Sequence, residues 1–213
     1  RRRMTGLNAE PQWQDGGIPG FQMRAAEDAW KVEIDRLRRP IGRQDHMAAA
    51  HGGLRLYSFT GDKAKIEHTF SDEDAAWVAK HIVLVQLPDG HDSRAILAGV
   101  KTPDTLEAAD LAVDPALKAL YQRDIGLLGL ALQRGHKSKT MIRGAVSPDI
   151  DAIVDELGRQ EGVTGCKVAG AGGGGHLVVA CDPGNIPFIE EAVQLPVLRV
   201  EPDLLGVRSN GCL

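Results

Sequence analysis

Apolar residues recur along this chain in two different periods, and each period predicts its own kind of element. A spacing of three or four residues is typical of an amphipathic helix, whereas a short apolar run or strict alternation is typical of a strand. The first pattern predicts helices over residues 22–38, 93–99, 114–133, 149–160 and 185–193. The second pattern predicts strands over residues 54–59, 82–87, 163–169, 176–181 and 196–202.

Residues 82–200 carry these elements in the order strand, helices, strand, strand, helix, strand. This order matches the split βαβ, ferredoxin-like arrangement of an α+β fold. We therefore expect a four-stranded antiparallel sheet with helices on one face. Ser147 and Pro148 mark the start of the helix at 149–160, because serine caps a helix N-terminus and proline suits its first turn.

Composition and charge narrow the classes of function. The chain has 213 residues, of which 43% are hydrophobic and 25% charged, as in an ordinary globular protein. The net charge of −4 provides no basic field, so we do not expect a nucleic-acid partner. No apolar run reaches the roughly 20 residues that a membrane span needs, so no membrane partner is expected. The histidines show no HExxH or paired Cys/His spacing, so no protein-built metal site is expected.

The cysteines point to the compartment. Cys166, Cys181 and Cys212 are odd in number and widely spaced, which does not suit a disulfide framework. They fit a reducing environment, so we expect a cytoplasmic protein. Cys166 and Cys181 fall on predicted buried strands and are expected to be core residues.

A glycine-rich run, AGAGGGGH at residues 169–176, separates two of the predicted strands. Glycine lacks a Cβ, so its backbone can take positive φ and approach a ligand closely. Successive N–H groups can then face an anion such as phosphate. A flexible hairpin turn is the alternative for such a run. The run does not end in the Gly-Lys-Ser/Thr of a Walker loop, and no helix directly follows it as a dinucleotide site requires.

A second motif, GRQDHMAAAHGG at residues 42–53, lies between a predicted helix and a predicted strand. It is expected to form a loop, a short helix through 47–50 and a Gly-Gly turn. Asp45 in this loop could accept a proton from a substrate hydroxyl. It could equally cap the short helix, since aspartate is a preferred N-cap, and on local grounds the cap is the commoner role.

Three segments of the chain resemble the GHMP superfamily of small-molecule kinases, which includes galactokinase and the homoserine and mevalonate kinases. The stretch AAEDAWKVEIDRLRRPIGRQDHMAAAHGGLRLYSF resembles the part of heptose kinases that leads into a Gly-x-Gln-Asp-Gln loop and a Gly-Gly turn. The stretch VTGCKVAGAGGGGHLVVACDP resembles the third conserved motif of the superfamily. Between them, HKSKTMIRGAVSPDIDAIVDE is similar to the segment that ends in Ser-Pro-x-Ile-Asp. The resemblance covers residues 21–207 and is greatest to the heptose-phosphorylating branch.

The resemblance implies ATP-dependent phosphorylation of a sugar or sugar-phosphate hydroxyl, most of all a heptose phosphate, with ATP and Mg²⁺ as cofactors. It implies that Asp45 is the base or orients the hydroxyl. It implies that Gly42, Arg43 and Gln44 bind the substrate. Ser93 and Arg94, which follow the strand 82–87, are weaker candidates for the same role. The residues expected beside the phosphates are Gly170, Ala171, Gly172, Gly173, Gly174 and Gly175. The family's glutamine after the aspartate is His46 here, a departure at the substrate loop.

The same resemblance divides the chain into an irregular segment at 1–20, a remnant of the family's N-terminal lobe at 21–75 and the C-terminal domain at 76–213. The family's ATP loop, a Gly-Leu-Gly-Ser-Ser-Ala run, has no counterpart in residues 1–20. We therefore expect no phosphorylation by this chain alone. It could be a fragment, a remnant without catalysis, or one part of a kinase whose missing lobe is supplied by another chain. A homodimer is a further possible assembly.

The alternative function is a non-catalytic ferredoxin-like module that binds a phosphorylated small molecule or a partner chain. Lys137 and Lys139 bear on this alternative, because either could touch a phosphate. A solvated basic helix end is the commoner environment for such lysines, and it is the one expected here.

Overall fold

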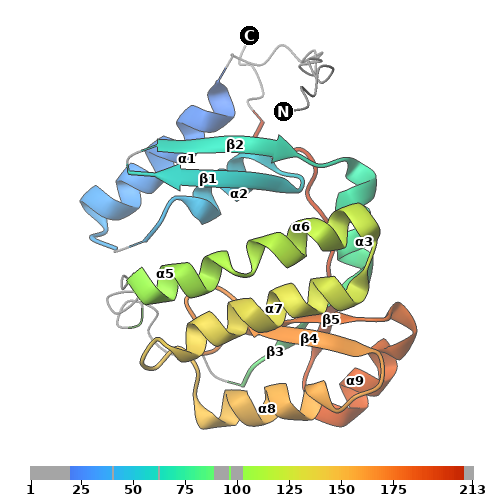
Figure 1. Ribbon diagram of the computed structural model, residues 1–213. Helices are drawn as coiled ribbons and strands as arrows, with labels where there is room; N and C mark the ends of the chain where they lie inside the picture. Colours follow the sequence, from blue (N-terminus) through green and yellow to red (C-terminus); the bar gives the residue numbers. More distant parts are fainter. Residues whose placement is uncertain (1–19, 40, 62, 89–95, 97–102, 209–213) are drawn as a thin grey trace.

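The computed structural model describes residues 20–39, 41–61, 63–88, 96 and 103–208. These residues form layers, which Figure 1 shows from top to bottom. A small layer from the start of the chain lies above the helices α5 (Pro103–Asp110), α6 (Val113–Gln122) and α7 (Ile125–Thr140). Helix α7 lies on a sheet, α5 and α6 pack against α7, and α8 (Pro148–Gly158) and α9 (Ile186–Val193) cover the sheet from below.

The upper layer pairs two helices with a hairpin. Its elements are α1 (Phe21–Lys31), a π-helical turn (Val32–Arg36), α2 (Gln44–His51), β1 (Arg55–Thr60) and β2 (Lys63–Thr69). The two strands are antiparallel. Ala26 of α1 and Met47 and Ala50 of α2 form its small core, against which Tyr57 packs. The predicted short helix, Gly-Gly turn and following strand are confirmed.

The main sheet has four strands, β3 (Ile82–Gln86), β4 (Val163–Val168), β5 (His176–Cys181) and β6 (Val197–Arg199). Their order is β4-β5-β3-β6 and every pair is antiparallel. This is the strand order of the ferredoxin-like arrangement, so the predicted fold class is confirmed.

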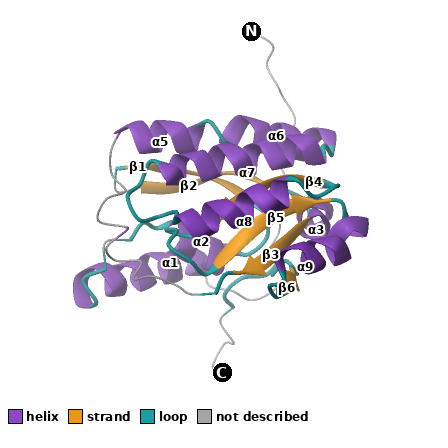
Figure 2. Cartoon of the chain, turned by 90° about the horizontal axis from the view of Figure 1, so that it is seen from below, coloured by secondary structure: helices purple, strands orange, loops and turns teal. Residues whose placement is uncertain are grey.

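Helices cover both faces of this sheet, so the expectation of helices on one face is wrong. On the lower face, seen toward the viewer in Figure 2, α8 (Pro148–Gly158) and α9 (Ile186–Val193) pack on Val83, Leu177 and Val179. On the other face, Ala180 packs against Leu128 of α7 (Ile125–Thr140) and Ala119 of α6 (Val113–Gln122). Alternate residues of a strand point to opposite faces of the sheet. A strand that is apolar at every position therefore needs helices packed on both faces.

The helix predicted over 114–133 is two helices. Arg123 takes a left-handed backbone conformation with φ 53°, which ends α6. Asp124 then begins α7 by accepting a hydrogen bond from the Leu127 N–H. No Gly or Pro marks this break, so the apolar period runs through it unchanged. The sequence pattern also missed β2, α3 (Asp72–His81) and α5 (Pro103–Asp110).

Other local predictions are confirmed. Ser147 caps α8 by accepting from the Ile150 N–H, with Pro148 in the first turn. Cys166 and Cys181 are buried core residues, and burial raises their thiol pKa values to about 12 and about 11. Of the predicted helix 93–99, only Ile96 lies within the described residues, and it is helical. None of the helices that the structure describes is long and apolar enough to cross a membrane.

The segment after β6 returns to the upper layer and binds the end of α2. The Gly53 N–H donates to the Asp203 carbonyl at 2.7 Å, and the Val207 N–H donates to the Ala50 carbonyl at 3.0 Å. A Cβ at Gly206 would collide with the Ala50 carbonyl oxygen. The close approach therefore requires glycine, and it ties α2 to the C-terminal segment of the chain.

Candidate active site

Asp45 lies in the first turn of α2 and is exposed. The cap position belongs to Arg43, and no side chain bonds to the first N–H groups of this helix. The interpretation of Asp45 as the helix cap is therefore wrong. Within the described residues, its carboxylate has no hydrogen bond and no ion pair, so it is free to meet a ligand.

The two neighbours of Asp45 in the motif are turned toward α1 instead. The Arg43 guanidinium lies 4.0 Å from the centre of the Trp30 ring, and its Nε is 3.5 Å from Glu27. His46 Nε2 is 3.7 Å from Glu33. Residues three apart share a face of a helix, so these contacts fix one side of α2 on α1 and on the π-helical turn that follows it. Asp45 does not lie on that side of the helix. The contacts of Arg43 and His46 therefore fix the helix that carries Asp45, but they do not involve its carboxylate.

The proposed substrate residues surround a surface hollow of about 330 Å³. Gly42, Arg43 and Gln44 line it together with Trp30 and Phe59. A Cβ at Gly42 would meet no atom within 4 Å, so this position opens onto free space. Asp45 does not line the hollow. The structure thus brings Gly42, Arg43 and Gln44 together around one hollow, whereas Asp45 lies outside it.

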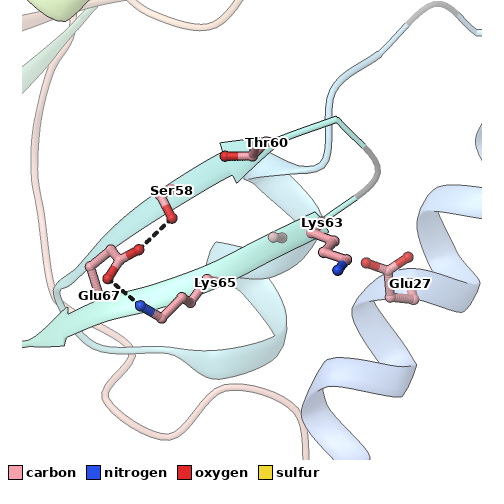
Figure 3. A pocket seen from close by; sticks show the side chains of 7 residues that line it. Glu27, Ser58, Thr60, Lys63, Lys65 and Glu67 are labelled. Carbon is pink, nitrogen blue, oxygen red and sulfur yellow. Dashed lines mark hydrogen bonds and ion pairs between the residues drawn. The ribbon is translucent and has the colours of Figure 1, made fainter.

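A second hollow, of about 490 Å³, lies over the β1–β2 hairpin and α1. Figure 3 shows its polar side chains, among which Glu67 accepts hydrogen bonds from Ser58 at 2.6 Å and from Lys65 at 2.7 Å. These bonds hold the pKa of the Glu67 carboxyl below its usual value. Ser58, Lys65 and Glu67 satisfy one another here, and neither the GRQDHMAAAHGG motif nor the glycine run lines this hollow, so it is not a candidate active site.

The glycine loop follows β4 and is fixed by the segment before α8. Gly173 donates its N–H to the Ala145 carbonyl at 2.6 Å, and Gly172 donates to the Ala169 carbonyl at 3.2 Å. Both glycines are buried, and a Cβ at Gly172 would collide with the Ala145 carbonyl oxygen. The loop is therefore a packed turn in its centre. Gly170, Ala171, Gly174 and Gly175 remain as its candidates for contact with a phosphate.

Two lysines accompany Asp45, and sequence analysis missed one of them. Lys139, in the last turns of α7, is only half-exposed, so the expected solvated position is wrong for it, although Lys137 is exposed as expected. Burial and the charge of Lys167 on β4 lower the pKa of Lys139, while the negative charge of Asp45 opposes them. Lys139 on α7 thus lies within reach of the charges of both Asp45 on α2 and Lys167 on β4. The sequence did contain a signal for Lys167, since it is the one charged residue in the otherwise mostly apolar strand VTGCKVA at residues 163–169.

Other predicted residues are less informative. Ser93 and Arg94 lie outside the described residues. The boundary expected after residue 75 falls inside α3. Within the described ranges no three His, Cys, Asp or Glu side chains gather as a metal site.

Known proteins resemble this chain in sequence and fold. It is 27% identical over 188 residues to the D-glycero-alpha-D-manno-heptose 7-phosphate kinase of Campylobacter jejuni, covering 83% of this chain and 54% of that protein. Its fold matches a D-glycero-D-manno-heptose 1-phosphate kinase from Bacteroides thetaiotaomicron with a TM-score of 0.64 at 17% identity, covering 89% and 55% of the two chains. It also matches a putative sugar kinase from Campylobacter jejuni with a TM-score of 0.65 at 21% identity, covering 90% and 58%.

The chain spans about half the length of these relatives. Residues 116–196 match the family described as GHMP kinases C terminal. That range runs from α6 to the start of β6 and includes the glycine loop and both lysines. Residues 116–196 are therefore similar to the C-terminal domain of GHMP kinases, in agreement with the resemblance of the sequence motifs.

Proposed function

We propose that this chain is part of an ATP-dependent kinase that phosphorylates a hydroxyl of a sugar or sugar phosphate, with Asp45 as the catalytic base. The substrate class we propose is a heptose phosphate, since two of the relatives are named as heptose phosphate kinases. The observation that carries the proposal is the position of Asp45. It is an exposed carboxylate with no hydrogen bond or ion pair among the described residues. Its helix is held by the contacts with Glu27 and Glu33 and at its C-terminal end, and its charge acts on the half-exposed Lys139.

In this reaction the sugar hydroxyl oxygen forms a bond to the terminal phosphorus of ATP, and the bond from that phosphorus to ADP breaks. Asp45 takes the hydroxyl proton, or orients the hydroxyl so that its oxygen is aligned for attack. Phosphoryl transfer depends mostly on positioning and on stabilising developing charge. Glycine-loop N–H groups and lysine ammonium groups are suited to that second task.

The test is Asp45→Asn in a form of the protein that also carries an ATP-binding lobe. Asparagine keeps the shape of the side chain and removes the charge and the proton acceptor. If Asp45 is the base, the single-turnover rate falls about 10²- to 10⁴-fold, the usual worth of a positioned general base. ATP affinity is expected to stay unchanged.

Asp72→Asn is the matched control, because Asp72 also lies in the first turn of a helix, is exposed and has no bonded partner among the described residues. Both variants lose a favourable charge at a helix N-terminus, worth about 0.3–1 kcal/mol. Their melting temperatures should fall alike while only Asp45→Asn slows the reaction. An Asp45→Asn protein with wild-type turnover would end the catalytic assignment.

The non-catalytic alternative retains one supporting observation, which is that the lysine pair lies in the C-terminal domain itself. Such a module would bind phosphorylated ligands without turnover. Equilibrium binding by this chain, measured beside the rates above, separates the two functions.

A further inference from the structure

The end of α7 and the edge strand β4 place two ammonium groups in one partly buried region. Lys167 on β4 crosses α7 directly over Gly135, where a Cβ would lie 3.0 Å from the lysine Cδ and 3.5 Å from its Nζ. Lys139 is one helical turn beyond Gly135 on the same face of α7. The missing side chain at Gly135 therefore gives Lys167 its path along the helix toward Lys139.

Neither ammonium group has a hydrogen bond or an ion pair in the part of the chain that the structure describes. Lysine is seldom buried unless it is paired, because removing a charge from water is costly. Burial lowers the pKa of both lysines, and their mutual repulsion contributes for Lys139. The Asp45 carboxylate offsets part of this cost for Lys139, and no acidic group of the described residues does so for Lys167. The lysine pair is therefore an unfavourable feature of the folded chain, and a bound anion would relieve it.

We propose that Lys139 and Lys167 together bind a phosphoryl group beside Asp45. A phosphate monoester carries nearly two negative charges at neutral pH, which two ammonium groups match. The group belongs either to a phosphorylated sugar or to the nucleotide. The inference rests on the proposed function only in naming these two sources, since binding itself needs no catalysis.

The glycine loop offers a neighbouring place for a second phosphoryl group. Gly170 follows Lys167 by three residues, which corresponds to roughly 10 Å along an extended chain. A kinase that acts on a sugar phosphate must hold two phosphoryl groups, one on the acceptor and one on ATP. The lysine pair and the loop provide two separate positions for them at the end of β4.

The binding test uses this chain and inorganic phosphate, followed by isothermal titration. Lys139→Met and Lys167→Met remove one charge each and keep most of the aliphatic length. Each is expected to weaken phosphate binding roughly tenfold to a hundredfold, the worth of a hydrogen bond to a charged group. Lys137→Met is the matched control, since Lys137 is an exposed lysine of the same helix end, and its affinity should stay within about twofold of wild type.

A second arm identifies the source of the phosphoryl group by competition. Mannose 1-phosphate and mannose 6-phosphate, with free mannose as their control, represent the sugar side, and a non-hydrolysable ATP analogue represents the nucleotide. Competition by a sugar phosphate but not by mannose assigns the lysine pair to the acceptor. Competition by the ATP analogue alone assigns it to the nucleotide.

The inference is overturned if no phosphate-bearing probe binds, or if Lys137→Met weakens binding as much as the other two changes. Thermal melts show whether Lys139→Met and Lys167→Met still fold. Both variants should have melting temperatures at least as high as that of wild type. Absence of kinase activity in every form of the protein would refute the proposed function and leave this binding result intact.

Discussion

Replacing Gly165 by alanine should force α7 away from β4, because no space exists between them for a methyl group. A Cβ at Gly165 would collide with the backbone of Gly129, and a Cβ at Gly129 would collide with the backbone of Thr164. Backbone atoms cannot move aside as the end of a flexible side chain can. The two glycines therefore set the distance between the helix and the sheet.

The cost follows from this overpacking. Inserting a methyl group into a filled contact destabilises a protein by about 1–3 kcal/mol. In a chain of this size, each kcal/mol lowers the melting temperature by about 2–4 °C, so Gly165→Ala should melt about 2–12 °C lower. Alanine suits a strand better than glycine does, so local propensity alone predicts no loss.

Gly158→Ala is the control, since a Cβ there meets no atom within 4 Å and the residue is the last of α8. Alanine in a helix is favoured over glycine by up to about 1 kcal/mol, so this variant should melt at the same temperature or a few degrees higher. Calorimetry of both variants is the assay. Phosphate affinity is a second readout, because α7 carries Lys139 and β4 carries Lys167. A Gly165→Ala protein that melts like wild type would refute the close contact.

Two further changes test the surroundings of the site. Burial lowers the folded-state pKa of Lys167, so its charge destabilises the fold below that pKa, and stability is regained as the pH rises toward the unfolded value of 10.5. Lys167→Met should therefore raise the melting temperature at pH 7 by more than at pH 11, and an equal gain at both would contradict the charge effect. Gly206→Ala should detach the segment after β6 from α2, because φ there is +62° and a Cβ would strike the Ala50 carbonyl oxygen. Faster hydrogen exchange at the Val207 and Gly53 amides would show the detachment, and unchanged exchange would argue against it.

Strong local signals in the sequence were sufficient for much of the fold. The strands around the glycine run and the helix that starts at Ser147 were predicted because short apolar runs, glycines and a capping serine act within a few residues. The helix break at Arg123 was missed because arginine gives no local sign of a left-handed conformation. In the fold its guanidinium contacts Asp74 and the Trp77 ring, which are distant in the sequence. α3 was missed although Ser71 and Asp74 form a reciprocal capping pair, which is a local signal.

The candidate site divides in the same way. The GRQDH motif and the glycine run identified Asp45 and the loop, since residue types at fixed spacing carry that information. The sequence alone could not decide whether Asp45 caps its helix, because both roles place aspartate at the same position. The structure excludes the cap, since Arg43 occupies that place.

The amino-acid sequence by itself determined the ferredoxin-like order of elements and the similarity of residues 116–196 to the C-terminal domain of GHMP kinases, because both depend on local patterns. Tertiary structure alone decided which charges meet. Asp45, Lys139 and Lys167 are separated by 94 and 28 residues in the sequence, and only the folded chain brings Lys139 near both of the others. Coulomb interaction depends on distance in space and on burial, and neither is encoded at any single position of the chain.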